Sequence, residues 1–146
     1  MDLGCYPVSL ATMLLEKLKF VNFEDYKVLS KKVEIGETGV DIDSKIEMKV
    51  NGTITIKLSS SFKRNIGSAT EIHGSRGSIE ILNTWSGSSN IILKKGNNKN
   101  VIKFNKIDDI YFDQLNVISN DLLNKNIGQN LDNMLLNMKI IDQWLN

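Results

Sequence analysis

The sequence of 146 residues contains one cysteine, one proline and one histidine. A single cysteine, Cys5, excludes an internal disulfide, which favours a reducing compartment, and we expect the cytoplasm. One histidine excludes a pair of histidine ligands, and no Cys, Asp or Glu cluster has metal-ligand spacing, so we expect no metal site. With one proline and 10 glycines the chain has no segment of the composition typical of interdomain linkers, which predicts a single domain over residues 1–146.

The chain also lacks a charge of one sign and any long apolar run. Lys and Arg number 18 against 17 Asp and Glu, so the net charge gives no reason to expect nucleic acid or an anionic membrane as a partner. No apolar run approaches the roughly 20 residues that span a bilayer. The first residues carry no cationic region of the kind that begins a signal peptide. We therefore expect a soluble globular protein.

Hydrophobic residues recur at helical spacing at both ends of the chain. Residues 7–18 are apolar around most of the helical circumference, which predicts a helix that is buried on several sides. Its few polar residues are Ser9, Thr12, Glu16 and Lys19. Two apolar stripes near the C-terminus predict two more helices, with a break at Gly128. The stripes are Tyr111, Leu115, Ile118 and Leu122, then Leu131, Met134, Leu135, Met138, Ile141 and Leu145.

Between these helices the hydrophobic period changes to two. Residues 40–50, "VDIDSKIEMKV", alternate apolar and polar side chains, which predicts a half-buried strand. The segment after Asn51-Gly52 alternates in the same way. A two-residue loop at Asn51-Gly52 would put the two apolar sets on opposite faces. We therefore expect a three-residue loop that ends at Gly52 and pairs Met48 with Ile54.

Five more short segments predict strands that are separated by turn-rich clusters. They are residues 26–35, 70–74, 77–82, 90–95 and 100–104. Successive strands without helices between them imply antiparallel pairing. We expect an α+β fold with an open, mainly antiparallel sheet of about six to eight strands and helices packed on one face.

The residues with most chemical potential stand at the start of the chain. Asp2 and Tyr6 are four residues apart, and on a helix they would share one face. A tyrosine can exchange a proton with a substrate hydroxyl, but its ordinary pKa of about 10 requires a neighbouring cation near neutral pH. The structural alternative is that Asp2 caps the helix and Tyr6 fills the core. Spacing alone leaves both interpretations open.

Other polar groups have structural interpretations. His73 stands before a turn, and we expect it to be a hydrogen-bonded structural residue. Asp41 and Asp43 lie on the polar face of a predicted strand, where solvation or cross-strand pairing is expected. The segment "GSRGS" lacks the spacing of a phosphate-binding loop and predicts a hairpin turn. Both tryptophans are expected in packing or at an interface.

Four segments, in order, carry a resemblance to a known family. The opening "DLGCYPVSLATMLL" resembles the start of the C-terminal domain of the Gfo/Idh/MocA family of NAD(P)-dependent oxidoreductases, where D-x-G-x-[YH] leads into a helix. The segment "ETGVDIDSKIEMKVNGTITIKLSSSF" is similar to the family's strand pair, and "IHGSRGSIEILNTW" to its hairpin. The ending "NMLLNMKIIDQWL" is similar to the family's last helix. Together the segments cover essentially the whole chain.

This resemblance implies a substrate-binding and oligomerisation domain of an enzyme that acts on a sugar-like or diol hydroxyl. Tyr6 occupies the family's acid/base position and Asp2 the assisting carboxylate, so these are the candidate catalytic residues. Tyrosine at this position leans toward the sugar and dihydrodiol dehydrogenase branch. The resemblance further implies NAD or NADP in the full-length parent and a homo-oligomer formed through the open sheet face.

The departures from the family pattern affect what the chain can do alone. The N-terminal Rossmann domain and the E-K-P segment, whose lysine would activate the tyrosine, are absent from these 146 residues. We therefore expect the chain to bind no cofactor and to be inactive by itself, either as an excised domain or as a truncated gene product. The competing hypothesis is a stand-alone, non-catalytic module for self-association or ligand binding.

Overall fold

The structure is a computed structural model that describes residues 2–18, 25–85, 90–104, 111–124 and 131–146. It divides into two compact units, the first Met1–Ile66 with Gly128–Asn146 and the second Gly67–Ile127. None of the described helices is long and apolar enough to cross a membrane. Lys19 and Gly128, the expected end of a polar stripe and the expected helix break, lie outside the described residues.

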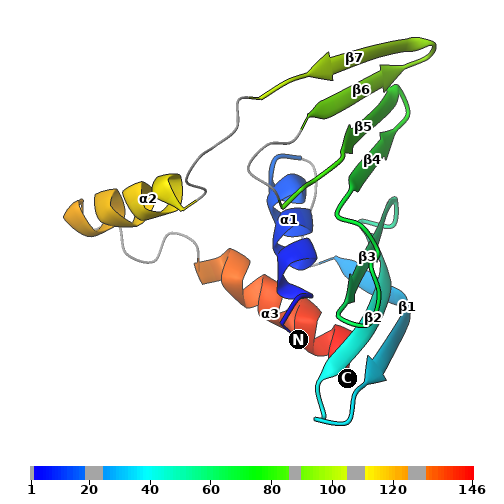
Figure 1. Ribbon diagram of the computed structural model, residues 1–146, viewed down its shortest axis with the longest axis vertical. Helices are drawn as coiled ribbons and strands as arrows, with labels where there is room; N and C mark the ends of the chain where they lie inside the picture. Colours follow the sequence, from blue (N-terminus) through cyan, green and yellow to red (C-terminus); the bar gives the residue numbers. More distant parts are fainter. Residues whose placement is uncertain (1, 19–24, 86–89, 105–110, 125–130) are drawn as a thin grey trace. The chain divides into compact units, whose positions relative to one another are not determined.

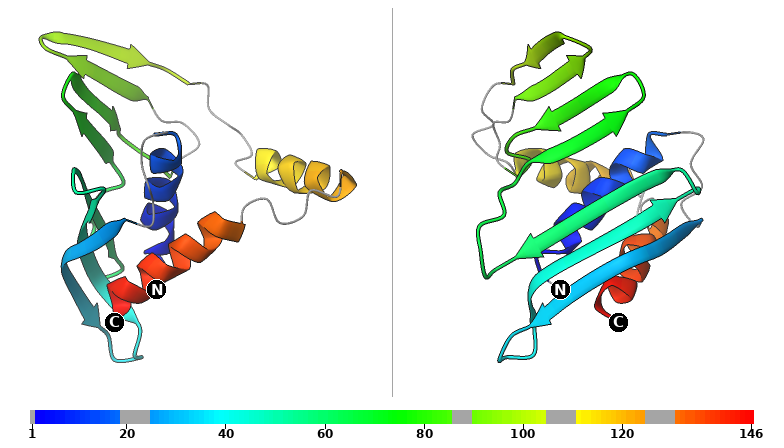
Figure 2. Two further views of the ribbon diagram at one scale, coloured as in Figure 1. Left: turned by 180° about the vertical axis from the view of Figure 1, so that it is seen from behind. Right: turned by 90° about the vertical axis from the view of Figure 1, so that its right-hand side faces the viewer.

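The first unit is a three-stranded antiparallel sheet with two helices on one face (Figures 1 and 2). Its elements are α1 (Cys5–Glu16), β1 (Tyr26–Ile35), β2 (Asp41–Val50), β3 (Ile54–Ser61) and α3 (Leu131–Leu145). The sheet order is β1-β2-β3. In the right-hand view of Figure 2 the sheet lies in front and α1 and α3 lie behind it. The helices therefore cover one face of this sheet and leave the other, outer face open within the unit.

The second unit is a four-stranded antiparallel meander with one helix after it. Its elements are β4 (Thr70–Gly74), β5 (Gly77–Ile81), β6 (Ile91–Lys95), β7 (Asn98–Ile102) and α2 (Phe112–Leu123). Helix α2 buries none of its residues. Within the described residues, three helices and seven antiparallel strands confirm the α+β class and the expected strand number. The strands are shared between a sheet of three and a sheet of four.

The core of the first unit lies between its sheet and its helices. Alternation along β2 buries Ile46, Met48 and Val50 on the helix-covered face, as the period of two predicts. The buried cluster consists of Val8, Ile46, Met48, Leu58, Ile140 and Trp144. Trp144 is fully buried, which confirms the expected packing role of that residue. This cluster attaches the helices to the sheet.

The hairpin between β2 and β3 keeps the predicted faces but not the predicted register. Met48 pairs with Ile56, and Val50 pairs with Ile54, so the pairing of Met48 with Ile54 was wrong by two residues. The loop contains three residues, but it extends through Thr53, because Asn51 and Gly52 both adopt positive φ and Thr53 donates to the carbonyl of Val50. A three-residue loop still places both apolar sets on one face.

Helix α1 is less buried than predicted, and some of its polar residues contact α3. Only Val8, Thr12 and Leu15 are buried. Thr12 Oγ1 donates to Asn137 Oδ1 of α3 at 2.7 Å, and Asn137 Nδ2 donates to Ser9 Oγ at 3.2 Å. The polar stripe of α1 therefore contacts asparagines of α3. Burial on several sides was wrong, because this interface uses the polar residues and leaves apolar ones exposed.

Replacing Thr12 by valine should destabilise the first unit by about 1–2 kcal/mol, because the Asn137 carbonyl loses its buried donor while the side-chain shape is kept. Ser9→Ala is the matched control on the same interface. Its hydroxyl is exposed, so we expect a loss below about 0.5 kcal/mol. Urea unfolding of the three proteins measures both values. Equal losses for the two variants would show that the part-buried Thr12–Asn137 hydrogen bond contributes no more to stability than the exposed Ser9 contact.

Candidate functional site

The candidate site begins just before α1. The helix starts at Cys5 with Gly4 at the N-cap position, and no side chain caps it. Asp2 therefore does not cap the helix, and it precedes the helix instead of sharing a helical face with Tyr6. Pro7 lies in the first turn, where its missing N–H is tolerated. The Cys5 thiol donates to the Asp2 carbonyl at 3.0 Å, which links the helix start to the residues in front of it.

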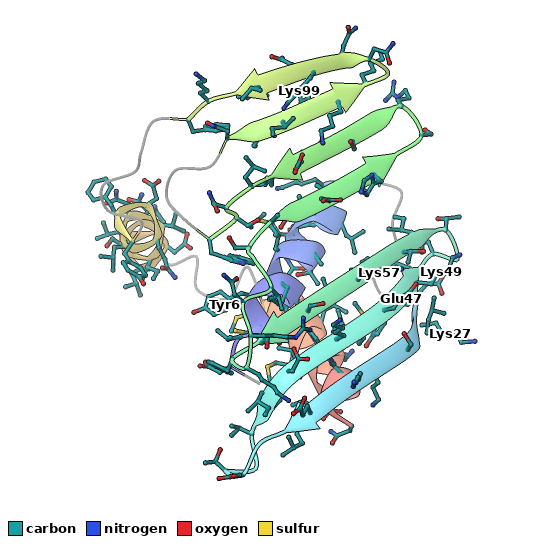
Figure 3. All side chains as sticks on the ribbon, turned by 45° about the vertical axis from the view of Figure 1, so that its right-hand side comes forward. Tyr6, Lys27, Glu47, Lys49, Lys57 and Lys99 are labelled. Atoms are coloured by element: carbon teal, nitrogen blue, oxygen red, sulfur yellow. The ribbon has the colours of Figure 1, made fainter. Side chains whose placement is uncertain are left out.

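Tyr6 lies on the side of α1 that faces away from the core of the first unit. Its side chain is 55 % exposed, whereas the buried residues of α1 lie on the opposite side of the helix. Figure 3 shows it near the N-terminal end of α1. The interpretation of Tyr6 as a core residue was therefore wrong. A tyrosine exposed to this extent can contact a ligand, and Asp2, which is also exposed, lies only four residues away in the chain.

A pocket of the first unit lies between its helices and its sheet, but it does not contain Tyr6. It is lined by Val8, Ala11, Thr12, Leu15, Tyr26, Met48, Val50, Ile56, Leu58, Leu136 and Ile140. Burial raises the pKa of Tyr26, the only phenol in this lining. The mostly aliphatic lining does not suit a sugar, which needs several convergent polar groups. The pocket belongs to the packing of the core.

The acidic residues of β2 have structural partners. Asp41 is buried and accepts a hydrogen bond from Ser44 Oγ at 3.2 Å, so solvation was the wrong expectation for it. Asp43 forms an ion pair with Arg64 at 3.2 Å. Desolvation raises the pKa of Asp43, but hydrogen bonds from Ser61 and Arg64 and the positive charges of Arg64 and Lys45 outweigh it, so the net pKa is lowered.

The remaining polar candidates of the sequence also have structural roles. His73 lies 3.1 Å from the Glu71 carboxylate, as expected for a hydrogen-bonded histidine. The segment "GSRGS" forms the hairpin turn between β4 and β5, where Gly74 pairs with Gly77. Within the described ranges, no three His, Cys, Asp or Glu side chains gather into a metal site. Tyr6 and Asp2, both of which are exposed, therefore remain the candidate pair for a ligand site.

Comparison with known proteins places the fold. No protein-family model and no curated protein sequence matches this chain. Among solved structures, a lysine-to-alanine variant of KijD10, a 3-ketoreductase from Actinomadura kijaniata in complex with TDP-benzene and NADP, matches with a TM-score of 0.81 at 13 % identity. The match covers 97 % of this chain and 45 % of KijD10. KijD10 with NADP and TDP-benzene matches with a TM-score of 0.76, again at 13 % identity, over 94 % of this chain and 41 % of that one. This chain therefore has the same fold as one part of KijD10. That part makes up less than half of the length of KijD10.

Proposed function

We propose that residues 1–146 form the substrate-binding and oligomerisation domain of an NAD(P)-dependent oxidoreductase that acts on a sugar-like or diol hydroxyl in the cytoplasm. The observation that carries the proposal is the fold match to part of a 3-ketoreductase that binds NADP and TDP-benzene, together with an exposed tyrosine in the D-x-G-x-Y segment at the start of α1. The alternative of a stand-alone, non-catalytic module has no observation of its own in its favour.

In the proposed enzyme, Tyr6 exchanges a proton with the substrate oxygen. During reduction of a ketone the phenol gives its proton to the oxygen while the carbon receives a hydride, and during oxidation of the alcohol the proton returns. Asp2 helps to place the substrate hydroxyl by accepting a hydrogen bond from it. Tyr6 is accessible for this role because more than half of its side chain is exposed. KijD10 has itself been solved with a tyrosine-to-phenylalanine substitution.

The nicotinamide cofactor, when bound in the whole enzyme, supplies or accepts the hydride. The residues of this chain do not fit it, because the sequence contains no G-x-G-x-x-G turn between a strand and a helix. The neighbouring KijD10 structures hold NADP in chains of which this one covers less than half. We therefore assign no step of hydride transfer to residues of this chain.

Titration calorimetry of the isolated chain with NADPH and NADH tests the division between substrate and nucleotide. We expect no measurable heat of binding, because the phosphate-binding turn is missing. A dissociation constant in the micromolar range, equivalent to about 8 kcal/mol of binding free energy, would show that the chain has a nucleotide site of its own.

We also propose that the chain self-associates through a sheet face. The suitable face belongs to the second unit, where the cross-strand rows Thr70–Ile81–Ile91–Ile102 and Ile72–Ile79–Leu93–Asn100 place six apolar side chains together. The outer face of the three-stranded sheet suits a two-fold contact less well, because its lysines would meet lysines of the second copy.

Ile102→Glu should convert the dimer to a monomer, because it buries an unpaired charge in the proposed contact. The matched control is Val101→Glu on the same strand. Val101 is 41 % and Ile102 38 % exposed, but they point to opposite faces, so the control should remain a dimer. Sedimentation velocity at about ten times the dissociation constant measures both. A monomeric unsubstituted chain, or equal dissociation by both variants, would contradict the proposed contact.

A further inference from the structure

Four lysines form two directly opposed pairs on the outer face of the first unit. Lys27 on β1 pairs with Lys49 on β2, and Lys32 pairs with Lys45. We call these four residues the lysine array. Opposed side chains on one face have Cβ atoms about 5 Å apart. The two pairs are four residues apart along β2, which corresponds to about 13 Å in a strand. Figure 3 shows the Lys27–Lys49 end of the array, with Lys57 and Glu47 beside it.

The carboxylates near the array are engaged by other cations. Glu47 pairs with Lys57 at 3.6 Å, Asp43 with Arg64 at 3.2 Å, and Glu34 with Lys63. In the described parts of the chain, no array lysine has an ion-pair partner of its own. Like charges that oppose each other directly destabilise a strand pair. The array is therefore a concentration of positive charge in a chain whose net charge is only +1.

The geometry of the array favours discrete carboxylates over a continuous polyanion. A carboxylate has two oxygens and can bridge both lysines of one pair. Glu47 lies between the two pairs on the same face of β2, two residues from Lys45 and two from Lys49. The phosphates of a nucleic-acid strand or of a lipid surface recur at short intervals, and one of them would lie over the Glu47 carboxylate. Two carboxylates about 13 Å apart can each contact one lysine pair without lying over Glu47.

The rest of the outer face supports the same choice of partner. The outward-facing residues of β2 and β3 near the array are Lys, Glu, Asp, Thr and Ser, namely Asp43, Lys45, Glu47, Lys49, Thr55, Lys57 and Ser59. An aromatic residue, on which unpaired bases could stack, is missing from this set. Apolar side chains are missing from these two strands as well, but the bulge of β1 next to Lys27 holds Leu29, which is 49 % exposed. The missing aromatic residues favour a protein partner over single-stranded nucleic acid.

We propose that the lysine array binds an acidic protein segment in extended conformation, with carboxylates at positions i and i+4 on one face and a cation at i+2. In an extended strand, positions i and i+4 are about 13 Å apart, which matches the two lysine pairs. The cation at i+2 then lies opposite Glu47. The Glu47 carboxylate would thus interact with two cations, this one and Lys57. Each end carboxylate bridges one lysine pair and offsets one of its two positive charges.

Two peptides of identical composition test this arrangement. The first, acetyl-TETKTET-amide, carries Glu, Lys and Glu in alternation on one face of a strand, and its isomer acetyl-TETETKT-amide places a glutamate opposite Glu47. NMR titration at low salt should show binding of the first peptide about fivefold tighter than of the isomer, with loss of both at about 0.3 M salt.

Substitutions in the protein complete the test. The double variant K27Q/K49Q should lose the preference for the first peptide, whereas K95Q/K99Q, which removes the same charge from the second unit, should keep it. Equal affinity for the two peptides, an equal effect of the two double variants, or tighter array-dependent binding of a DNA duplex or of phosphatidylserine vesicles would overturn the proposal. The proposal would also be overturned if the chain self-associated in a salt-sensitive way and K27Q/K49Q, but not K95Q/K99Q, abolished this association. The partner of the array would then be a second copy of the chain.

Discussion

Trp144→Ala should remove about 3–5 kcal/mol from the free energy of unfolding of the first unit. The indole is fully buried and belongs to the cluster that joins α3 to the sheet, so truncation leaves a large cavity between layers that are already in place. Without this side chain α3 keeps Ile140, the partly buried Leu136 and Ile141, and the polar contacts with α1. Urea unfolding followed by circular dichroism measures the loss.

Trp144→Phe is the control that separates packing from hydrogen bonding. Trp144 Nε1 is buried and has no hydrogen-bond partner within the described residues, so a phenyl ring loses no polar contact. We expect a loss of about 1–1.5 kcal/mol, well below that of alanine. If phenylalanine were as destabilising as alanine, the indole N–H would hold an interaction, for example with a buried water, that matters more than its volume.

Gly77→Ala should destabilise the four-stranded sheet by about 3 kcal/mol, the second large effect. A Cβ on Gly77 would lie 2.1 Å from the backbone carbonyl oxygen of Lys94, and the backbone φ of 151° is one that side chains rarely adopt. Because the obstacle is backbone of the neighbouring strand, β5 would have to move away from β6. Amide hydrogen exchange should show lost protection in β5 and β6 first.

Gly74→Ala in the same hairpin is the matched control. Its Cβ would meet the Gly77 carbonyl oxygen at 3.7 Å, an ordinary contact, so we expect a change within about 0.5 kcal/mol. Exchange in β2 and β3 serves as the internal reference, because these strands belong to the first unit. If both alanine variants had equal protection in β5 and β6, the close approach at Gly77 would carry no energetic weight.

Periodicity predicted the strands of the first unit well, because β2 and β3 alternate apolar and polar side chains. It was less exact for β7, which is exposed throughout and extends from Asn98 to Ile102 instead of over residues 100–104. Strand β1 begins and ends where the sequence pattern placed it, at Tyr26 and Ile35, and the hairpin turn before Gly77 was recognised from its glycines. The register of β2 against β3 was wrong by two residues. Parity of the apolar pattern distinguishes odd from even loops, but it cannot distinguish two registers that differ by two residues.

The helix α1 shows why burial was harder to predict than helicity. An apolar residue recurs on nearly every side of it, so the pattern does not say which side faces the core. The side that faces the core is set by distant contacts, one of which is the hydrogen bond from the Thr12 hydroxyl to Asn137, 125 residues away in the sequence. No local pattern contains that contact. The same orientation exposes Tyr6 and makes it a candidate for catalysis.

The lysine pairs were not anticipated, because each lysine alone is an ordinary residue on the polar face of a strand. The opposition of Lys27 to Lys49 depends on the bulge in β1 between Val28 and Ser30, which shifts the register along that strand. A bulge has no reliable signature in a single sequence. The alternating lysines of residues 45–49 were visible, but the partners that they face were not.

The central claim, that this chain carries the substrate side of an oxidoreductase site at the start of α1, can be tested by NMR titration of the 15N-labelled chain with a TDP-linked hexose. We predict weak, saturable shifts confined to the amides of Asp2 and of the first turn of α1, including Tyr6, and no such shifts with NADPH. A response to NADPH at these amides, or a sugar-nucleotide response that spares the first turn of α1, would contradict the claim.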